Sequence, residues 1–475
     1  MYYESIMSST APNRVSWFSG TINPPKGSKV NGTNKHMGGP TLDNRDSVGC
    51  ERTDSGKPFS CVPLRWKTVP EYLQEAGISW RVYQDKDNFG DDPLVMWKQY
   101  QTSAKKKGDL AQRGTSFPGL QKFFDDARDG KLPEVSYIVA PMQLSEHPPY
   151  MPMDGAWIQG EVAKAVMHGK NWDSTALIYS YDETGGWADH VVSPYPPQSE
   201  ESEWIEDPYD KSNGITPIGP GFRLPFYIVS PWTSGGHVFT EHAAHESQIM
   251  FLEQWALAHG KPFTSEEIPT WRREQLSDLV KAFDFSSKDT SVPEVPHVRK
   301  PSQDIFTGHF NGADVCQAIH LKKVQPDIPY KKLNPSNSME VNKGFKRLRG
   351  DVTEGRRLTF EAHNRALSHS GSKLKSSSSS KEHDQKDQLF VVHWQGVNPK
   401  DNRFRIATTD QLYITKSLSL SKNEEKAALF SLKDMGNGVG YSISELDSGK
   451  RLQLNEDGSV ALGGDTYFQI YSVTL

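Results

Sequence analysis

The sequence contains no run of eighteen or more apolar residues, which is the minimum for a membrane-spanning helix. Its first residues, MYYESIMSSTAPNR, also lack the charged segment followed by an apolar stretch that marks a signal peptide. Basic residues are not in excess, because 54 lysines and arginines face 59 aspartates and glutamates and give a net charge of −5. A groove for nucleic acid needs such an excess. We therefore expect neither a transmembrane segment nor a nucleic-acid partner.

Cysteine is also scarce, with three residues in 475. Cys50 and Cys61 are near enough in sequence to close a short loop in an oxidising compartment, which would leave Cys316 unpaired. Three free thiols are equally compatible with the sequence. One N-x-T sequon starts at Asn31 and is usable on a secretory route. The cysteine content alone therefore leaves the compartment open.

A chain of 475 residues exceeds one ordinary hydrophobic core, which favours two domains. From about residue 60 to 285, apolar β-branched runs alternate with segments that carry apolar residues at helical spacing. This alternation predicts an α/β domain over residues 1–285, with a mainly parallel sheet and flanking helices. In such a sheet, ligands bind beyond the carboxyl ends of the strands. The expected strands are GISWRVYQ, EVSYIVAP, TALIYSYDE and FYIVSPW.

The rest of the chain has a different composition. Residues 286–370 are rich in proline and charge and are expected to form a connecting region. Residues 371–387, GSKLKSSSSSKEHDQKD, are polar and low in complexity, which is typical of a linker. Short, turn-separated and partly alternating runs follow, and they predict a small all-β domain over residues 388–475. The sequence of this β domain does not indicate its partner.

Polar side chains gather where the expected strands end. Asp182 and Glu183 follow the run TALIYSY, and Asp189 and His190 come a few residues later. An isolated carboxylate pair is more often a turn cap with a solvated neighbour, but carboxylates and imidazoles are also ligands of divalent metals. Several histidines near strand ends favour a functional site: His147, His237, His242 and His245.

Seven motifs together resemble a known family. In chain order they are TAPNR, GISWRVYQ, KLPEVSYIVAP, SEHPP, YDETGGWADHV, GFRLPFYIVSPW and HESQIMFLEQW. They closely resemble the phosphoesterase family of bacterial and fungal phospholipase C and acid phosphatase enzymes, over about residues 8 to 285. The resemblance implies an alkaline-phosphatase-like α/β fold and a metal-assisted attack by a hydroxyl group on phosphorus.

The resemblance also assigns roles to individual residues. The family nucleophile falls on Thr10 of TAPNR, whose hydroxyl a divalent cation would activate by lowering its pKa. Asp182 and Glu183 match the adjacent acidic pair that binds this cation together with Thr10, and the cation tolerates two like charges side by side. Three more residues match active-site histidines that neutralise phosphoryl oxygens or protonate the leaving alcohol: His147, His190 and His245.

One family feature is missing from the sequence. In relatives an E-N-x-S-F-D motif, whose Glu and Asn also bind metal, precedes the nucleophile, and this sequence contains no such motif. The sequence therefore predicts a chain without its first strand and without two metal ligands. We expect either a truncated form of a secreted or cell-wall-associated enzyme or a protein that has lost activity.

Three functions are compatible with these observations. The motifs YDETGGWADHV and SEHPP favour a phospholipase C-like hydrolase that cuts a phosphodiester such as phosphatidylcholine into diacylglycerol and a phosphorylated head group. Trp157 and Trp187 are candidates for holding a quaternary ammonium by cation–π contact, or for ordinary packing. The first alternative is an acid phosphatase acting on phosphomonoesters. The second is a non-catalytic protein whose β domain binds carbohydrate, lipid or another protein.

Overall fold

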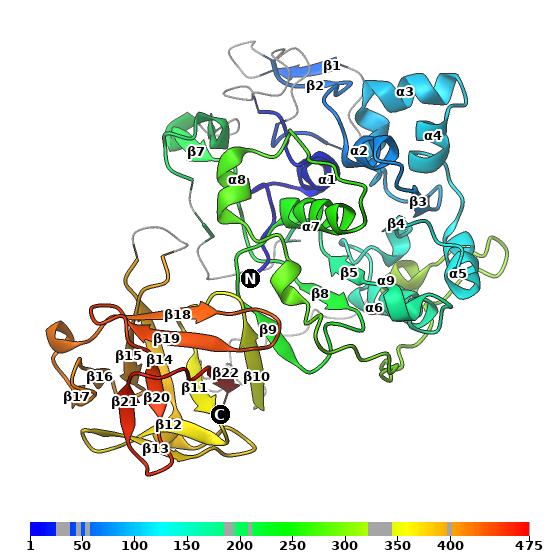
Figure 1. Ribbon diagram of the computed structural model, residues 1–475. Coiled ribbons are helices and arrows are strands. Elements are labelled where there is room, and N and C mark those ends of the chain that lie inside the picture. Colours follow the sequence, from blue (N-terminus) through cyan, green and yellow to red (C-terminus); the bar gives the residue numbers. More distant parts are fainter. Residues whose placement is uncertain are drawn as a thin grey trace. The chain divides into compact units, whose positions relative to one another are not determined.

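The computed structural model describes residues 1–24, 39–43, 49–52, 58–184, 193–194, 196–207, 211–321, 344–396 and 401–474. The chain divides into two compact units (Figure 1). The first unit contains residues 1–231, 242–280 and 289–323, and the second contains residues 232–241, 281–288 and 324–475. Across the described ranges, no helix combines the length and the apolar character that crossing a membrane requires.

The first unit is a mixed α/β structure in which short strands alternate with helices (Figure 1). Its helices are α1 (Thr10–Ser19), α2 (Val69–Glu75), α3 (Lys98–Lys105), α4 (Asp109–Gly114), α5 (Leu120–Asp129), α6 (Pro152–Met167), α7 (His245–Ala258), α8 (Thr270–Gln275) and α9 (Gly312–His320). Its strands are β1 (Gly49–Arg52), β2 (Pro58–Val62), β3 (Trp80–Gln84), β4 (Val135–Val139), β5 (Leu177–Ser180), β6 (Trp204–Glu206), β7 (Ile215–Pro217) and β8 (Phe226–Val229).

The strands of the first unit pair two by two. β3 and β4 are parallel, and helices α3, α4 and α5 lie between them in sequence, as a crossover connection requires. β5 and β8 are antiparallel. In the described part of residues 181–225, which connect them, the chain forms the antiparallel β6–β7 pair and no α-helix. A strand that returns without a crossover helix pairs antiparallel, which explains the direction of β8. With these antiparallel pairs, the expected mainly parallel, alkaline-phosphatase-like sheet is not confirmed.

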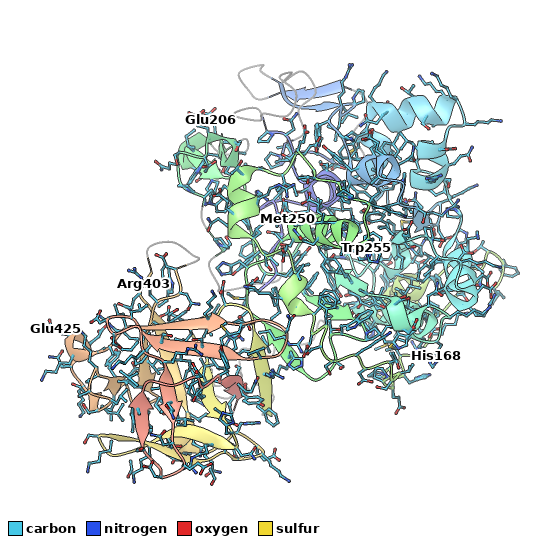
Figure 2. All side chains as sticks on the ribbon, viewed as in Figure 1. His168, Glu206, Met250, Trp255, Arg403 and Glu425 are labelled. Carbon is cyan, nitrogen blue, oxygen red and sulfur yellow. The ribbon has the colours of Figure 1, made fainter. Side chains whose placement is uncertain are left out.

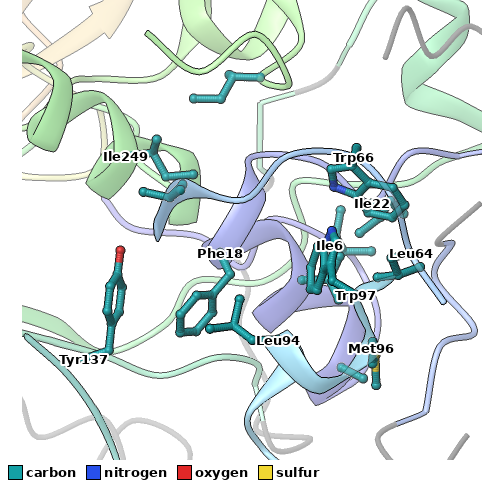
Figure 3. Packing of buried hydrophobic residues seen from close by; sticks show 14 of the residues in the cluster. Ile6, Phe18, Ile22, Leu64, Trp66, Leu94, Met96, Trp97, Tyr137 and Ile249 are labelled. Carbon is teal, nitrogen blue, oxygen red and sulfur yellow. The ribbon is translucent and has the colours of Figure 1, made fainter. Parts of the chain in front are cut away.

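Helix α1 is embedded in the hydrophobic core of the first unit. Pro12 lies in its first turn, where a missing N–H leaves no hydrogen bond unmade. Gly20 ends the helix at a φ of 83°, a left-handed conformation that glycine adopts without strain. Figure 3 shows Phe18 of α1 next to Tyr137 and Leu94, and the ring centroids of Phe18 and Tyr137 are 4.7 Å apart.

Helix α7 lies beside α1 and supplies another part of this core (Figure 1). Met250 of α7 is 5% exposed, and Trp255 is partly buried against the same cluster (Figure 2). The first residue of α1 is Thr10 and the first residue of α7 is His245. The packing of the two helices therefore fixes the backbone at two of the predicted site residues.

The second unit is rich in strands, as predicted for the C-terminal region. Its main sheet is antiparallel except for the parallel β9–β10 pair. Phe360, Phe390 and Phe430 are fully buried in its core. Its strands are β9 (His237–Phe239), β10 (Gly344–Arg349), β11 (Arg357–Ala362), β12 (Arg365–Ser370), β13 (Lys373–Ser378), β14 (Phe390–Trp394), β15 (Phe404–Thr408), β16 (Tyr413–Ile414), β17 (Leu420–Ser421), β18 (Phe430–Asp434), β19 (Tyr441–Glu445), β20 (Leu452–Leu454), β21 (Val460–Leu462) and β22 (Gln469–Thr474).

Two sequence-based boundaries are wrong. Strands β10, β11 and β12 lie within the expected connecting region, residues 286–370, and β13 lies within the expected linker, residues 371–387. The linker prediction relied on polar composition. In the structure Ser376 is 4% exposed, and its hydroxyl accepts a hydrogen bond of 2.6 Å from Nε of Arg365. Because a small hydroxyl can be buried when it is hydrogen-bonded, this serine-rich stretch forms part of the sheet.

Candidate active site

A cavity of about 180 Å³ lies in the first unit, lined by residues of α1, β4, β5, α6 and α7 and of the loops that follow β3, β4 and β5. Two of its carboxylates, Glu146 and Asp182, follow β4 and β5, beyond whose carboxyl ends ligands were expected. The polar and charged side chains of the lining include Arg14, Asp91, Glu146, Gln159, Asp182 and His245.

Thr10, the predicted nucleophile, is half-buried at the start of α1. Arg14 lies one helical turn later, and residues four apart share a helix face. Arg14 lines the cavity, whereas Thr10 is not among the lining residues. The structure thus places Thr10 on the helix face that leads to the cavity.

Asn13 fixes the segment that precedes Thr10. Its side chain is fully buried, and Oδ1 accepts a hydrogen bond of 2.9 Å from the N–H of Ile6. Nδ2 donates to the carbonyl oxygens of Ile6, Ser8 and Ser9 at 2.9, 3.2 and 3.2 Å. These contacts hold the chain before the helix and so position Thr10.

Asp182 is joined to α1 through Arg14. Nε of Arg14 donates to Oδ2 of Asp182 at 2.8 Å, and Nη2 of the same guanidinium lies 3.3 Å from Oδ2 of Asp91. Burial acts to raise the pKa of Asp182, but the charge and the hydrogen bond of Arg14 outweigh burial and hold this pKa below its ordinary value. Asp182 is therefore ionised at neutral pH.

His245, at the start of α7, contacts the turn after β5 that carries Asp182 and Glu183 (the acidic turn). Its Nε2 lies 2.9 Å from the carbonyl oxygen of Asp182, and its Nδ1 lies 2.8 Å from the hydroxyl of Tyr2. A carbonyl oxygen only accepts, so Nε2 carries a proton. Burial lowers the pKa of His245, which keeps the ring neutral, and Nδ1 then accepts the proton of Tyr2. His245 therefore holds the backbone of the turn that carries Asp182.

Glu4 is a buried carboxylate that the sequence did not single out. It is 2% exposed, and its Oε1 accepts from the N–H of Phe222 at 3.0 Å. Its Oε2 accepts no hydrogen bond within the described chain, although the backbone N–H of Thr184 lies near enough to the carboxylate to lower its pKa. Burial raises the pKa of Glu4 to about 8, with further upward contributions from the charges of Glu183 and Asp182. A cation near Oε2 would take the place of the missing hydrogen-bond donor and would reduce the repulsion between Glu4 and the carboxylates of Asp182 and Glu183.

The structure does not place the other two predicted histidines, His147 and His190, at the cavity. His147 is exposed, and its Nδ1 lies 2.6 Å from the carbonyl oxygen of Pro148. It does not line the cavity, whereas its neighbour Glu146 does. His190 and Trp187 lie outside the described residues. The catalytic roles of the histidines stay predictions.

The cation site also stays a prediction. Thr10, Asp182 and Glu183 are its expected ligands, and Asp182 is paired with Arg14. Among the residues that the structure describes, no three or more His, Cys, Asp or Glu side chains are grouped so that they could hold a metal ion. The unpartnered oxygen of Glu4 is the observation that fits a cation at this place.

Sequence motifs gave a signal for some of the residues that the sequence reasoning missed. Arg14 is the last residue of TAPNR, and Glu146 precedes the histidine of SEHPP, so both lie inside quoted motifs. Asp91 and Glu4 lie in no motif. Their place in the site follows only from the fold.

Comparisons with known proteins identify the family of the chain and several similar proteins. The Phosphoesterase family matches residues 1–257. The chain is 34% identical over 357 residues to a non-hemolytic phospholipase C of Pseudomonas aeruginosa, covering 72% of this chain and 46% of the relative. It is 33% identical over 327 residues to a non-hemolytic phospholipase C of Burkholderia pseudomallei, covering 62% of this chain and 43% of the relative.

A third similar protein is phospholipase C B of Mycobacterium tuberculosis, which is 31% identical over 312 residues, covering 63% of this chain and 55% of the relative. The chain thus spans about half the length of each of these relatives. The family match covers more than half of the 475 residues and includes α1, the acidic turn and most of α7. The chain therefore belongs to the phosphoesterase family.

Proposed function

We propose that this chain carries the active site of a phospholipase C-like hydrolase, which cleaves the phosphodiester of a phosphatidylcholine-type phospholipid by attack of the Thr10 hydroxyl on phosphorus. The contact of Arg14 with Asp182 carries this proposal, because it brings the first turn of α1 to the acidic turn at the cavity. The three similar proteins are all named phospholipases C, which supports the same reaction class.

The start of α1 suits an anionic substrate. The helix is ten residues long and has no acidic side chain in its first turn. The partial positive charge at a helix N-terminus attracts phosphate. Thr10 stands at this end, where its oxygen would form a bond to phosphorus while the bond to the diacylglycerol oxygen breaks.

The remaining steps use the predicted histidines and water. His147 and His190 are proposed to neutralise the phosphoryl oxygens or to give a proton to the departing diacylglycerol oxygen, while the proton that the Thr10 hydroxyl loses passes to solvent. Attack of a water on the phosphorylated Thr10 then releases the phosphorylated head group and restores the hydroxyl. His245 and Asn13 contribute by position, since one holds the acidic turn and the other holds the segment before Thr10.

A divalent cation is proposed to bind between Asp182, Glu183 and the Thr10 hydroxyl. Glu4 fits this set, because its Oε2 lacks a partner and carboxylate oxygens are preferred ligands of hard divalent cations. When bound, the cation would lower the pKa of the Thr10 hydroxyl and screen the acidic pair.

The substrate class is tested by comparing p-nitrophenyl phosphorylcholine with p-nitrophenyl phosphate in the presence of Mg²⁺, Mn²⁺, Ca²⁺ or Zn²⁺. We expect kcat/KM to be higher for the choline diester, by about tenfold or more, which corresponds to about 1.4 kcal/mol of transition-state stabilisation. Short-chain phosphatidylcholine should release diacylglycerol. The opposite preference would indicate an acid phosphatase, and hydrolysis of neither ester with any cation would favour the non-catalytic alternative.

Glu4→Gln tests the cation site without an activity assay. We expect one of these cations at millimolar concentration to raise the Tm of the wild-type chain at pH 8, because a ligand that binds only the folded state stabilises it. Removing the charge of Glu4 should weaken the cation affinity about tenfold or more, measured as the cation concentration needed for the same Tm shift.

The matched control is Glu267→Gln. Glu267 is also a buried glutamate whose pKa is raised by burial, but its hydrogen bonds are with Tyr72 and Ser265. We expect this variant to respond to the cation like the wild type. Equal responses of the two variants would remove Glu4 from the cation site.

A further inference from the structure

We propose that Glu146 and the aromatic side chains around it form a subsite for a cationic head group, either an amine or a quaternary ammonium. The proposal rests on the proposed function, because the head group is the part of the substrate that stays on phosphorus when the diacylglycerol leaves. Glu146 lines the same cavity as Asp182, and the two lie in the segments that follow β4 and β5.

The fold places the Glu146 carboxylate in the cavity at some conformational cost. The backbone of Glu146 has a φ of 67°, a left-handed conformation that is unfavourable for a glutamate. Gly155 of α6 makes room for the side chain, since a Cβ at position 155 would lie 2.1 Å from Cγ of Glu146. Strained residues that the surrounding structure over-determines cluster at functional sites.

Neutral hydrogen bonds hold this carboxylate in place. Tyr181 donates its hydroxyl to Oε2 at 2.6 Å, and Gln159 donates Nε2 to Oε1 at 2.8 Å. Gln159 is itself held, because its Oε1 accepts from the hydroxyl of Tyr227 and its carbonyl oxygen accepts from the hydroxyl of Tyr179 at 2.6 Å. No lysine or arginine of the described chain pairs with Glu146, so its charge lacks a counter-ion there.

The charges that line the cavity favour a cationic ligand. Asp91, Asp182 and Glu146 are acidic, Arg14 is the basic residue of the described lining, and His245 is neutral. Arg14 is already engaged by both aspartates. The carboxylate of Glu146 is therefore the one that a positively charged ligand would neutralise, and burial raises its pKa in the absence of such a ligand.

The chemistry around Glu146 fits an organic cation better than a metal ion. Both carboxylate oxygens already accept a hydrogen bond, which leaves few lone pairs for metal ligation. Trp17, Tyr179 and Tyr181 line the cavity, and aromatic faces attract ammonium groups. A cavity of about 150 Å³ holds a benzene-sized molecule, so about 180 Å³ admits a trimethylammonium group.

Trp157, which the sequence suggested for binding the head group, is not part of this subsite. Trp157 does not line the cavity, and its ring packs against that of Phe310 at a centroid distance of 5.5 Å. Packing was the alternative interpretation of Trp157, and its contact agrees with that interpretation. Glu146 with the tyrosines of β5 and its following loop replaces it as the candidate for head-group recognition.

Glu146→Gln tests the subsite through substrate preference. p-Nitrophenyl phosphorylcholine and bis(p-nitrophenyl) phosphate release the same product by the same bond cleavage, but only the first carries a cation. We expect the ratio of their kcat/KM values to fall about tenfold or more in Glu146→Gln. Glu161→Gln removes the same charge from α6, where Glu161 pairs with Lys164, and should leave this ratio within twofold of wild type. An unchanged ratio in Glu146→Gln would overturn the proposal.

Calorimetry with tetramethylammonium chloride separates this inference from the proposed function. Binding to the wild-type chain that weakens about tenfold or more in Glu146→Gln supports the subsite even when no ester is hydrolysed, in which case only the proposed function fails. Absence of binding to the wild-type chain, or equal binding to Glu146→Gln, rejects the subsite even when esters are hydrolysed.

Discussion

Replacing Thr10 with alanine is expected to lower kcat for p-nitrophenyl phosphorylcholine by about 10³-fold or more, because the variant lacks the oxygen that attacks phosphorus. The loss should appear in kcat rather than KM, since Thr10 does not line the cavity that holds the rest of the substrate. Alanine is a good helix former, and the Thr10 hydroxyl has no hydrogen bond to lose within the described chain, so the Tm should be nearly unchanged.

Two variants make this result specific. Thr10→Ser restores a hydroxyl at the same backbone position and should recover activity to within about tenfold of wild type. Ser9→Ala removes the neighbouring hydroxyl, which is exposed and caps no N–H of α1, and should behave like wild type. If Thr10→Ala hydrolysed the diester at the wild-type rate, the nucleophile would have to be another residue.

The sequence singled out candidate site residues that lie in short motifs. Thr10, Asp182 and His245 were singled out from their motifs, and the structure joins Asp182 to the helix of Thr10 and to the ring of His245. The partner of Asp182 was not predicted, because Arg14 is 168 residues away in the chain. A contact between residues so far apart in the chain depends on how α1 packs. Composition and the spacing of apolar residues predict local structure and do not predict that packing.

Glu146 shows a second reason for such misses. In the sequence it is an ordinary glutamate beside a more conspicuous histidine. Its importance comes from the left-handed backbone at Glu146, the absence of a side chain at Gly155 and the hydroxyl of Tyr181. These three features come from separate segments, so only the folded chain brings them together.

The same limit applies to the fold. Helical spacing and apolar runs indicated the alternation of strands and helices correctly, but strand direction depends on what connects two strands. The connection between β5 and β8 contains the β6–β7 pair in its described part, and β8 returns antiparallel. In the second unit, a serine-rich composition predicted a linker, whereas buried hydroxyl groups with hydrogen-bond partners allow strand β13.

Arg272→Met is expected to destabilise the first unit by about 3–5 kcal/mol, the usual result of removing one partner from a buried ion pair. Arg272 is 2% exposed and joins two fully buried carboxylates. Its Nε and Nη2 donate to Glu203, its Nη1 donates to Glu246 at 2.8 Å, and Nη1 also donates to the carbonyl oxygen of Ser5 at 2.9 Å. Differential scanning calorimetry of the whole chain should show a lower Tm for the transition of this unit.

Arg273→Met is the matched control on the same helix. Arg273 is 27% exposed and pairs with Glu253, which is 8% exposed and keeps a hydrogen bond of 2.8 Å from the N–H of Ser265 when Arg273 is replaced. We expect a smaller destabilisation than in Arg272→Met, because only one carboxylate loses its partner and the replaced side chain lies partly in water. Arg272→Lys keeps the charge and loses the forked geometry, so it should fall between the wild type and Arg272→Met. A loss in Arg272→Met no larger than that in Arg273→Met would contradict the assignment of Arg272 as the buried counter-ion.

The pH dependence of the Arg272→Met effect provides an independent test. In the wild type, Arg272 and two serine hydroxyls outweigh burial and lower the pKa of Glu246. The stability that Glu246 contributes is therefore present above its unfolded pKa of about 4.3 and is lost as the pH falls through the lower folded pKa. Without Arg272, burial raises the folded pKa of both carboxylates, so the variant loses stability as the pH rises through those values. The Tm difference between wild type and Arg272→Met should therefore be larger at pH 8 than at pH 5. A Tm difference that does not change with pH would mean that lost packing, rather than uncompensated charge, destabilises the variant.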